Sequence, residues 1–243
     1  MAPTRSSIDA RLPAYLQLRD RLAARIASGE WGPGDALPSE NVLSREHQLS
    51  VGTVRRATQQ LVDEGLLERR QGAGTFLRKP AFDATLFRFF QMLSEDGSAP
   101  SIPQSSLVSR ALVTAPAAVG EVLGTDRVLR IDRVRSLADR PILAEEIYVS
   151  ADRFAGFESI PESALGPLLY PVYFDRFGIL VARAVDDLRF GHAPEASAQL
   201  LGIASGDPVA VIERTAFAPD GTAVEWRVAR GDAKRFRYRS HIS

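Results

Sequence analysis

The sequence predicts an α+β protein of two domains, and three features of the 243-residue chain support this fold class. Up to about residue 65, apolar side chains recur with the three- and four-residue spacing of amphipathic helices. Residues 66–78 change to two short strand-like runs around a glycine-rich tip. Beyond residue 115, strand-like segments alternate with short helical ones and no long crossover helix joins them, which is typical of an antiparallel sheet with packed helices.

The first two helices are predicted from apolar spacing and from the residues that flank it. A helix is expected over 13–28, where Tyr15, Leu18, Leu22 and Ile26 share one face, and Gly29 ends it. A short second helix is expected after Ser39, a residue type that caps helix N-termini, with Val42, Leu43 and Leu49 as its apolar contacts.

The third helix and the hairpin complete the N-terminal unit. Ser50 is the predicted N-cap of a helix that runs to about Glu64, and Gly65 terminates it. The segments 66–70 and 75–78 are predicted strands around the tip at 71–74. Three helices followed by a hairpin is the element order of a winged helix, so we expect a DNA-binding domain over 1–78.

The remainder of the chain is predicted to form a second domain over 86–243, after a linker at 79–85 that contains Pro80. Strands are expected at 128–136, 142–149, 181–190, 208–216 and 223–230. Helices are expected at 115–123, 163–177 and 194–201.

The composition excludes several classes of protein. Zero cysteines rule out disulfides, thiolate metal sites and cysteine nucleophiles. No apolar run reaches the roughly 18 residues of a membrane span, and the first ten residues lack the apolar core of a secretory signal, so we expect a cytoplasmic protein with no membrane partner. The net charge is zero, so only local basic clusters such as Arg55–Arg56 and Arg69–Arg70 argue for DNA binding.

Candidate enzyme and metal sites are absent from the sequence patterns. His47, His192 and His241 are isolated and lack ligand spacing, so no metal is expected. No Gly-x-Ser-x-Gly elbow is present, and no helix follows Gly72 and Gly74 as a dinucleotide loop requires. We therefore expect no catalytic residues and no cofactor.

The third predicted helix has the features of a recognition helix. Such a helix needs an apolar stripe to dock and polar or basic residues at its N-terminal end, where the free N–H groups also attract phosphate. Ser50, Thr53, Arg55 and Arg56 occupy that end, and Gly52 allows the backbone to approach the duplex. The tip at Gln71–Gly72 is thin enough to enter a minor groove.

A second candidate site lies on the strand predicted at 128–136. Alternation places Arg133 and Arg135 on the same face as aliphatic Leu129 and Ile131, and the next strand places Glu145 among aliphatic residues. Charges on an apolar face are costly unless they are paired or ligated. Two hypotheses follow: the arginines bind the anionic group of a ligand, or Arg133 and Glu145 form a structural ion pair.

The N-terminal unit resembles the GntR family of transcription regulators over residues 12–77. The motifs that carry the resemblance are Pro13-Ala14-Tyr15, Gly29, Pro33-Gly34, Leu37-Pro38-Ser39-Glu40, Thr53-Val54-Arg55, Leu61, Glu64-Gly65-Leu66 and Gln71-Gly72-Ala73-Gly74-Thr75-Phe76. With the helix caps and basic pair included, the DNA contacts that this implies are Ser39, Asn41, Ser50, Val51, Gly52, Thr53, Arg55, Arg56, Gln71 and Gly72. Asn41 stands where many members carry an arginine, and Val51–Gly52 replaces a more polar pair, so we expect an operator that differs from the commonest family site.

The second half is similar to the effector-binding UTRA domain of the HutC branch of that family, whose fold is like that of chorismate lyase. The segments that carry the similarity are Arg133-Val134-Arg135, Pro141 to Glu145, Tyr148-Val149, Leu169-Tyr170, Arg176 to Ile179, Leu200, Gly206-Asp207-Pro208, Val224-Glu225 and Arg230-Gly231-Asp232. The similarity implies effector contacts at Arg133, Arg135, Glu145, Tyr170 and Glu225. Leu168 stands where some sugar-phosphate-binding members carry serine, which weakens an amino-sugar phosphate assignment.

The sequence therefore predicts a ligand-responsive regulator: a homodimer that binds double-stranded operator DNA and is released as a repressor by a small anionic metabolite. Two alternatives stay open, a chorismate-lyase-like enzyme tethered to DNA and a ligand-independent DNA-binding dimer. The sequence names neither the effector nor the operator, and a repressor is the favoured interpretation over an activator without a residue pattern that encodes the sign of regulation.

Overall fold

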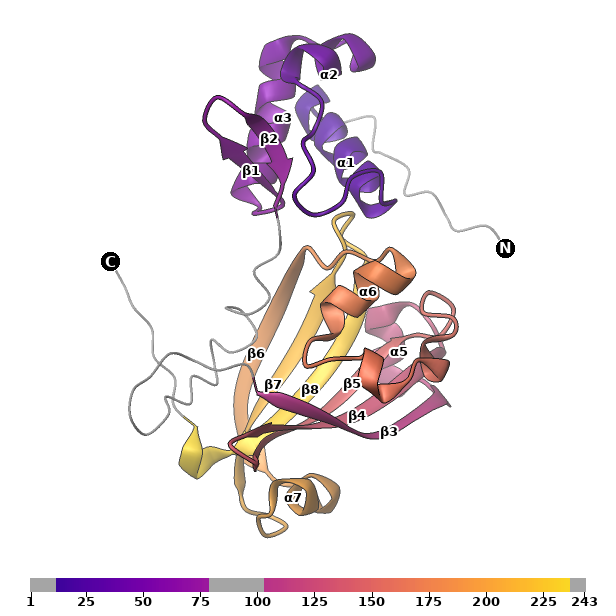
Figure 1. Cartoon of the computed structure of the whole chain (residues 1–243), viewed down its shortest axis with the longest axis vertical. Coiled ribbons are helices and arrows are strands. Elements are labelled where there is room, and N and C mark those ends of the chain that lie inside the picture. The colour runs from indigo at the N-terminus through magenta and orange to yellow at the C-terminus, as the bar shows by residue number, and fades with distance from the viewer. Residues whose placement is uncertain (1–11, 79–102, 237–243) are drawn as a thin grey trace. The chain divides into compact units, whose positions relative to one another are not determined.

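The computed structural model describes residues 12–78 and 103–236, which form two compact units (Figure 1). One unit is built on the elements before residue 80 and the other on the elements from residue 103 onward. The predicted linker at 79–85 and the predicted domain start at residue 86 lie outside the described residues. Within the described ranges, no helix is both long enough and apolar enough to cross a bilayer.

The N-terminal unit begins with the three predicted helices, α1 (Ala14–Ala27), α2 (Glu40–His47) and α3 (Val51–Asp63). Both predicted caps are present: the Ser39 hydroxyl accepts a hydrogen bond from the N–H of Val42, and the Ser50 hydroxyl accepts one from the N–H of Thr53 at 3.1 Å. The predicted stripe is buried, because the apolar side chains facing the inside of the helices have almost no exposed surface: Leu18, Leu22, Ile26, Leu43, Val54, Ala57 and Leu61. Val42, predicted as an apolar contact, is instead exposed.

A two-stranded hairpin follows α3. β1 (Leu67–Arg70) pairs antiparallel with β2 (Gly74–Leu77), and Leu67 and Leu77 face each other in the core. Gly72 and Gly74 have φ of +72° and +118°, a backbone conformation that L-residues with a Cβ adopt only with strain. The helix order and the hairpin confirm the predicted winged helix.

The C-terminal unit is built on one antiparallel sheet with the strand order β3-β4-β5-β8-β7-β6. The strands are β3 (Gln104–Thr114), β4 (Arg127–Leu137), β5 (Arg140–Ser150), β6 (Arg183–His192), β7 (Pro208–Phe217) and β8 (Ala223–Asp232). Each neighbour in this order is antiparallel, so the predicted α+β class is confirmed.

Helices cover both faces of this sheet, and the alternation of side chains decides which face each helix covers. α5 (Ala117–Leu123) and α7 (Glu195–Leu201) pack on the face that carries Val128, Val211 and Val228. α6 (Leu169–Phe177) lies on the opposite face, as Figure 1 shows, and its tyrosines contact β8 there. The described residues of this unit also contain three single 3-10 turns, at Phe157–Ser159, Glu162–Ala164 and Ala233–Arg235.

Two expectations for this unit were wrong. The helix predicted at 163–177 is a 3-10 turn followed by α6, because Gly166, with φ of +60°, and Pro167 interrupt it. Strand β3 was not predicted at all. Its side chains are mostly exposed and polar, and a register shift at Val108 interrupts the alternation that identifies a strand.

Candidate functional site

The N-terminal end of α3 is the first candidate site, and it is open to solvent. The Ser50 hydroxyl holds the N–H of Thr53 at 3.1 Å and also contacts the Thr53 hydroxyl at 2.9 Å, which fixes the first turn. Gly52 is exposed, and a Cβ there would meet only the Ser50 hydroxyl, at 3.8 Å. A flat, open helix end of this kind can approach a phosphate backbone closely.

Two arginines beside this end share one carboxylate. Glu40, in the first turn of α2, accepts hydrogen bonds from Arg55 of α3 at 2.9 Å and from Arg69 of β1 at 3.3 Å. The Glu40 carboxylate thus connects the predicted recognition helix to the hairpin: Oε2 accepts from Arg55 and Oε1 accepts from Arg69. Both arginines remain well exposed, so their other N–H groups face solvent.

The remaining predicted DNA contacts lie around the same surface. Asn41, Gly52, Gln71 and Gly72 are exposed, whereas Val51 is partly buried. A groove of about 430 Å³ runs between the start of α2 and the hairpin, lined among others by Ser39, Glu40, Arg69, Arg70, Gln71 and Gly72. Arg56 differs from its neighbour, because its guanidinium lies over the ring of Tyr15 in α1, 4.0 Å from the ring centre.

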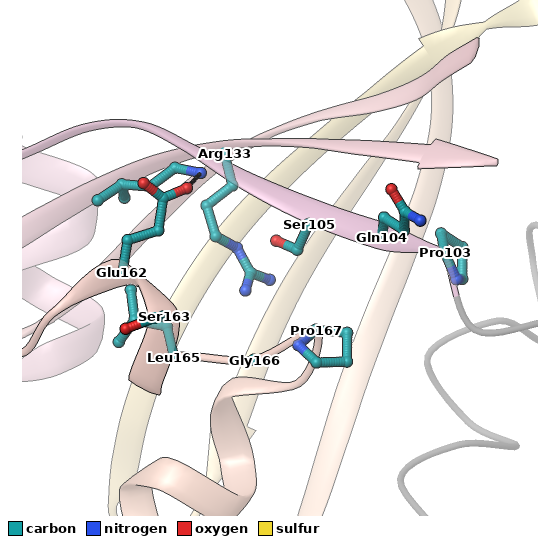
Figure 2. A pocket seen from close by; sticks show the side chains of 10 residues that line it. Pro103, Gln104, Ser105, Arg133, Glu162, Ser163, Leu165, Gly166 and Pro167 are labelled. Carbon is teal, nitrogen blue, oxygen red and sulfur yellow. Dashed lines mark hydrogen bonds between the residues drawn. The ribbon is translucent and has the colours of Figure 1, made fainter. Parts of the chain in front are cut away.

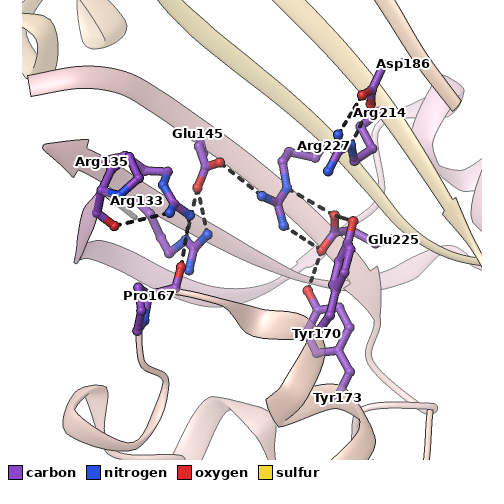
Figure 3. Close-up of polar contacts among 11 residues, drawn as sticks. Arg133, Arg135, Glu145, Pro167, Tyr170, Tyr173, Asp186, Arg214, Glu225 and Arg227 are labelled. Atoms are coloured by element: carbon purple, nitrogen blue, oxygen red, sulfur yellow. Dashed lines mark hydrogen bonds and ion pairs between the residues drawn. The ribbon is translucent and has the colours of Figure 1, made fainter. Parts of the chain in front are cut away.

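The second candidate site is a group of charged and phenolic side chains inside the C-terminal unit, on the face of the sheet covered by α6. We call it the buried charge cluster, and Figure 3 shows its members: Arg133, Arg135, Glu145, Tyr170, Tyr173, Asp186, Arg214, Glu225 and Arg227. Each strand from β4 to β8 contributes to it because period two places these residues on one face of the sheet.

Glu145 is the centre of the cluster. Its Oε2 accepts hydrogen bonds from the Nη2 and Nε of Arg133, at 2.7 and 3.2 Å, and its Oε1 accepts one from the Nη1 of Arg227 at 3.0 Å. Burial alone raises the pKa of Glu145, but the charges of Arg227 and Arg133 outweigh it and lower the pKa to about 2. Glu145 is therefore ionised at neutral pH and bridges two arginines.

Glu225 extends the chain of contacts to α6. Its carboxylate accepts two hydrogen bonds from Arg227, at 2.9 and 3.0 Å, and one from each phenol, at 2.6 Å from Tyr173 and 3.2 Å from Tyr170. Burial and the Glu225 charge raise the pKa of both phenols, so both stay protonated and act as donors. These bonds fasten α6 to the sheet.

Arg135, two residues along β4 from Arg133, bonds to two backbone carbonyls. Its Nη1 donates to the carbonyl of Pro167 at 2.9 Å and its Nη2 donates to the carbonyl of Pro103 at 3.2 Å. Burial lowers the pKa of Arg135 to about 10, because the charges of Arg133 and Arg227 add to its effect and the opposing charge of Glu145 does not outweigh it. The group is cationic at neutral pH in an environment that disfavours cations.

A cavity of about 450 Å³ opens beside the cluster, between β3 and the loop that carries Glu162 to Pro167. Figure 2 shows the guanidinium of Arg133 pointing into it, with Ser105 on one side and Pro167 on the other. The Nη1 of Arg133 and the hydroxyl of Ser105 are buried and have no hydrogen-bond partner among the described residues. A buried donor in this state costs free energy until an acceptor reaches it.

The structure brings all five predicted effector-site residues into this one cluster, with Arg133 at the cavity and Tyr170 and Glu225 beneath α6. The Arg133–Glu145 ion pair exists, and Arg133 also lines the cavity, so the two hypotheses about this arginine are not exclusive.

Three members of the cluster, Arg227, Arg214 and Tyr173, were not predicted from the sequence. Alternation along β8 places Arg227 on the same face as Glu225, and alternation along β7 places Arg214 beside aliphatic Ile212. This is the signal that identified Arg133. Arg214 pairs with Asp186 at 2.5 and 2.6 Å, a contact between strands that the sequence alone does not align.

Comparison with protein families matches each half of the chain to a different family model. A model described as bacterial regulatory proteins, gntR family, matches residues 14–77, and a model of the UTRA domain matches residues 100–237.

Individual relatives extend over the whole chain. The HTH-type transcriptional repressor NagR of Bacillus subtilis (strain 168) is 32% identical over 231 residues, 93% of each chain. The mannosyl-D-glycerate transport/metabolism system repressor MngR of Escherichia coli (strain K12) is 34% identical over 148 residues, 56% of this chain and 58% of its own. Among solved structures, PhnF from Mycobacterium smegmatis has the same fold, with a TM-score of 0.53, 24% identity and coverage of 95% of this chain and 99% of its own.

Proposed function

The chain belongs to the GntR family of bacterial regulatory proteins and carries a UTRA domain, and on this basis we propose that it is a repressor that a small anionic metabolite releases from its operator. It acts as a homodimer on double-stranded DNA in the cytoplasm. Relatives named as repressors, NagR and MngR, support the sign of regulation. The effector site is the cavity beside the buried charge cluster.

The DNA-binding part of the proposal rests on the exposed end of α3. Arg55 and the N-cap Ser50 lie at the end that enters a major groove in this fold, and the Gln71–Gly72 tip is exposed for the adjacent minor groove. Because Glu40 holds Arg55 and Arg69 only at exposed positions, phosphate oxygens can replace its carboxylate without a large desolvation cost.

The anionic character of the effector follows from the balance of buried charge. The buried charge cluster holds four arginines against three carboxylates, Glu145, Glu225 and Asp186. A buried excess of positive charge is costly unless an anion neutralises it. Arg133 supplies the single observation that carries the proposal, because its Nη1 is buried, lacks a partner among the described residues and faces a cavity large enough for a small metabolite.

The proposed mechanism is thermodynamic linkage. The effector must bind the DNA-free state more tightly than the DNA-bound state, because a ligand with equal affinity for both shifts nothing. A ligand anion on Arg133 changes the partner of a side chain that also holds Glu145, and Glu145 connects through Arg227 to Glu225 and α6. The effector therefore contacts one end of a continuous chain of buried hydrogen bonds that ends on a helix.

A thermal-shift screen with matched compounds tests this function. Phosphate monoesters and carboxylates are compared with the uncharged alcohols and amides of the same size. A ligand at a hundred times its dissociation constant should stabilise the folded state by about 2.7 kcal/mol, and the same compound should release duplex DNA that the protein has selected from a random pool. Stabilisation by the uncharged compounds alone would contradict an anionic effector.

A ligand-independent regulator is the second candidate, and one observation favours it: Arg133 already has an ionic partner inside the protein. On this reading the cluster only holds α6 on the sheet. It predicts operator binding that none of the screened compounds changes.

A further inference from the structure

The outer edge of β6 (Arg183–His192) is a regular row of backbone groups that no described strand covers. β6 is the last strand in the sheet order, and β7 pairs with it along all ten residues without a register shift. A long edge without a bulge presents its N–H and C=O groups as a template for a further strand.

Large apolar side chains on β6 are unusually exposed. Phe190 is 64% exposed, Val185 47% and Leu188 37%. Proteins usually protect a free edge with bulges, proline or charges. β6 has no bulge and no proline, and of its four charged residues Asp186 is taken up by Arg214, which leaves Arg183, Asp187 and Arg189 as its other charges. The edge therefore has the properties of a strand that pairs in the functional protein.

The charges on β6 indicate what kind of strand pairs with it. Asp187 lies directly opposite Glu213 of β7, and like charges at opposed positions destabilise a sheet. Arg189 is on the same face two residues further along, and its nearest carboxylate oxygen, on Glu213, is 3.9 Å away. Among the described residues, the edge thus carries an acidic position, opposite a glutamate, and a basic position whose ion pair is long, on the same face of the strand.

From these observations we propose that β6 pairs antiparallel with β6 of a second copy of this chain, about a twofold axis at Leu188, and joins the two six-stranded sheets into one. The proposal rests on the homodimer of the proposed function and names its interface. Opposite residues in an antiparallel pair point to the same face of the sheet. In a symmetric pair, one residue must therefore lie opposite the same residue of the second copy, and the twofold axis runs between the two. An axis at Leu188 places Asp187 opposite Arg189 of the partner subunit, and symmetry repeats this ion pair.

Other registers are less favourable. An axis at Asp186 places Arg189 opposite Arg183, a contact between like charges. An axis at Val185 pairs Arg183 with Asp187 but leaves half of the strand without a partner, and Arg183 already lies over the ring of Phe217, 3.8 Å from its centre.

The opposite edge of the sheet, β3, lacks these properties. A register shift at Val108 interrupts its regular pairing, and bulges of this kind blunt an edge. Its one charged residue, Arg110, donates to the carbonyl of Phe157 at 3.0 Å. No pair of opposite charges is available on β3 for self-complementary pairing.

Cysteine cross-linking in the full chain tests the axis directly, because the natural chain contains no cysteine. Opposite residues in an antiparallel pair are about 4.5–5.5 Å apart at Cα, within the range that a disulfide spans. Leu188→Cys should therefore form a covalent dimer on mild oxidation, while Leu112→Cys on β3, an exposed leucine of similar type, should stay monomeric on a non-reducing gel. The proposal would be overturned if the protein is a dimer in sedimentation but Leu188→Cys forms no covalent dimer. Covalent dimers of Leu112→Cys would overturn it as well.

Charge exchange tests the register independently. Asp187→Arg and Arg189→Asp should each raise the dimer dissociation constant at least about tenfold in sedimentation at low salt, because each places like charges across the axis. The double variant Asp187→Arg/Arg189→Asp should recover most of the affinity. A double variant as weak as either single variant would overturn this register.

DNA binding to the selected duplex separates this inference from the proposed function. If the protein is a dimer that binds DNA but fails both the cross-linking and the charge-exchange tests, only the β6 interface is overturned. A dimer that passes both tests and binds no duplex from the random pool overturns the proposed function alone.

Discussion

The two units of this protein each contain a glutamate that receives two arginines from two different elements, but in opposite environments. In the winged helix, Glu40 of α2 holds Arg55 of α3 and Arg69 of β1. In the UTRA domain, Glu145 of β5 holds Arg133 of β4 and Arg227 of β8. The side chains of Arg55, Arg69 and Glu40 are 62%, 40% and 22% exposed, whereas those of Arg133, Arg227 and Glu145 are 2–3% exposed.

The difference in burial determines what each arrangement can do. In water the charges of Glu40 and its arginines are largely screened, so the pairs contribute little and can be exchanged for phosphate contacts. Inside the sheet neither partner can leave without exposing an unpaired buried charge. The same three-residue pattern is therefore an exchangeable arrangement in the winged helix and a fixed one in the UTRA domain.

The largest expected effect comes from neutralising the buried centre. Glu145→Gln keeps the side-chain shape but leaves Arg133 and Arg227 without the charge they share. We expect the free energy of unfolding to fall by about 3–5 kcal/mol in urea titration, the usual cost of breaking a buried ion pair from one side. A fall in the free energy of unfolding of less than about 1 kcal/mol would mean that the buried Glu145 contributes no more to stability than an exposed ion pair.

Acid should reveal the same charge without a mutation. The pKa of Glu145 is about 2 in the folded protein against an ordinary value of 4.5, so its ionised form stabilises the fold above pH 4.5 and this contribution is lost as the pH falls toward 2. The shift corresponds to about 3 kcal/mol. Unfolding free energies measured from pH 5 to pH 2 should fall more steeply for the natural chain than for Glu145→Gln. Parallel curves would assign the acid sensitivity to other carboxyls.

Removing an exposed arginine should affect DNA binding more than stability. Arg55→Ala is expected to weaken binding to the selected duplex by about 1–3 kcal/mol in anisotropy titrations at fixed salt. Its melting temperature should stay close to that of the natural chain, since the side chain is mostly in solvent. Unchanged affinity would remove Arg55 from the DNA-contacting surface.

The smallest effect is expected for the exposed counterpart of Glu145. Glu40→Gln should change the free energy of unfolding by less than about 1 kcal/mol, because both arginines regain water when the carboxylate charge is lost. The free energies of unfolding of Glu40→Gln and Glu145→Gln are measured by urea titration under the same conditions, so that each variant is the control for the other. Equal losses in the two variants would refute the comparison between the units.

Much of the winged helix was predictable because its signals are local. Ser39 and Ser50 cap the helices that follow them, and the apolar spacing of Leu18, Leu22 and Ile26 matches the buried face of α1. The sheet was harder. The edge strand β3 lacks alternation, and the turn at Gly166–Pro167 divides a segment whose composition alone favoured a single helix.

The sequence by itself determined the fold class, the two families of the chain and the face of β4 on which Arg133 and Arg135 lie. Periodicity and capping are properties of neighbouring residues, so one strand or helix suffices to show them. Only the tertiary structure decided which charges meet. Glu145 of β5 accepts a hydrogen bond from Arg227 of β8, a residue 82 positions further along the chain. Strand order and register place those side chains together, and no local pattern encodes that order.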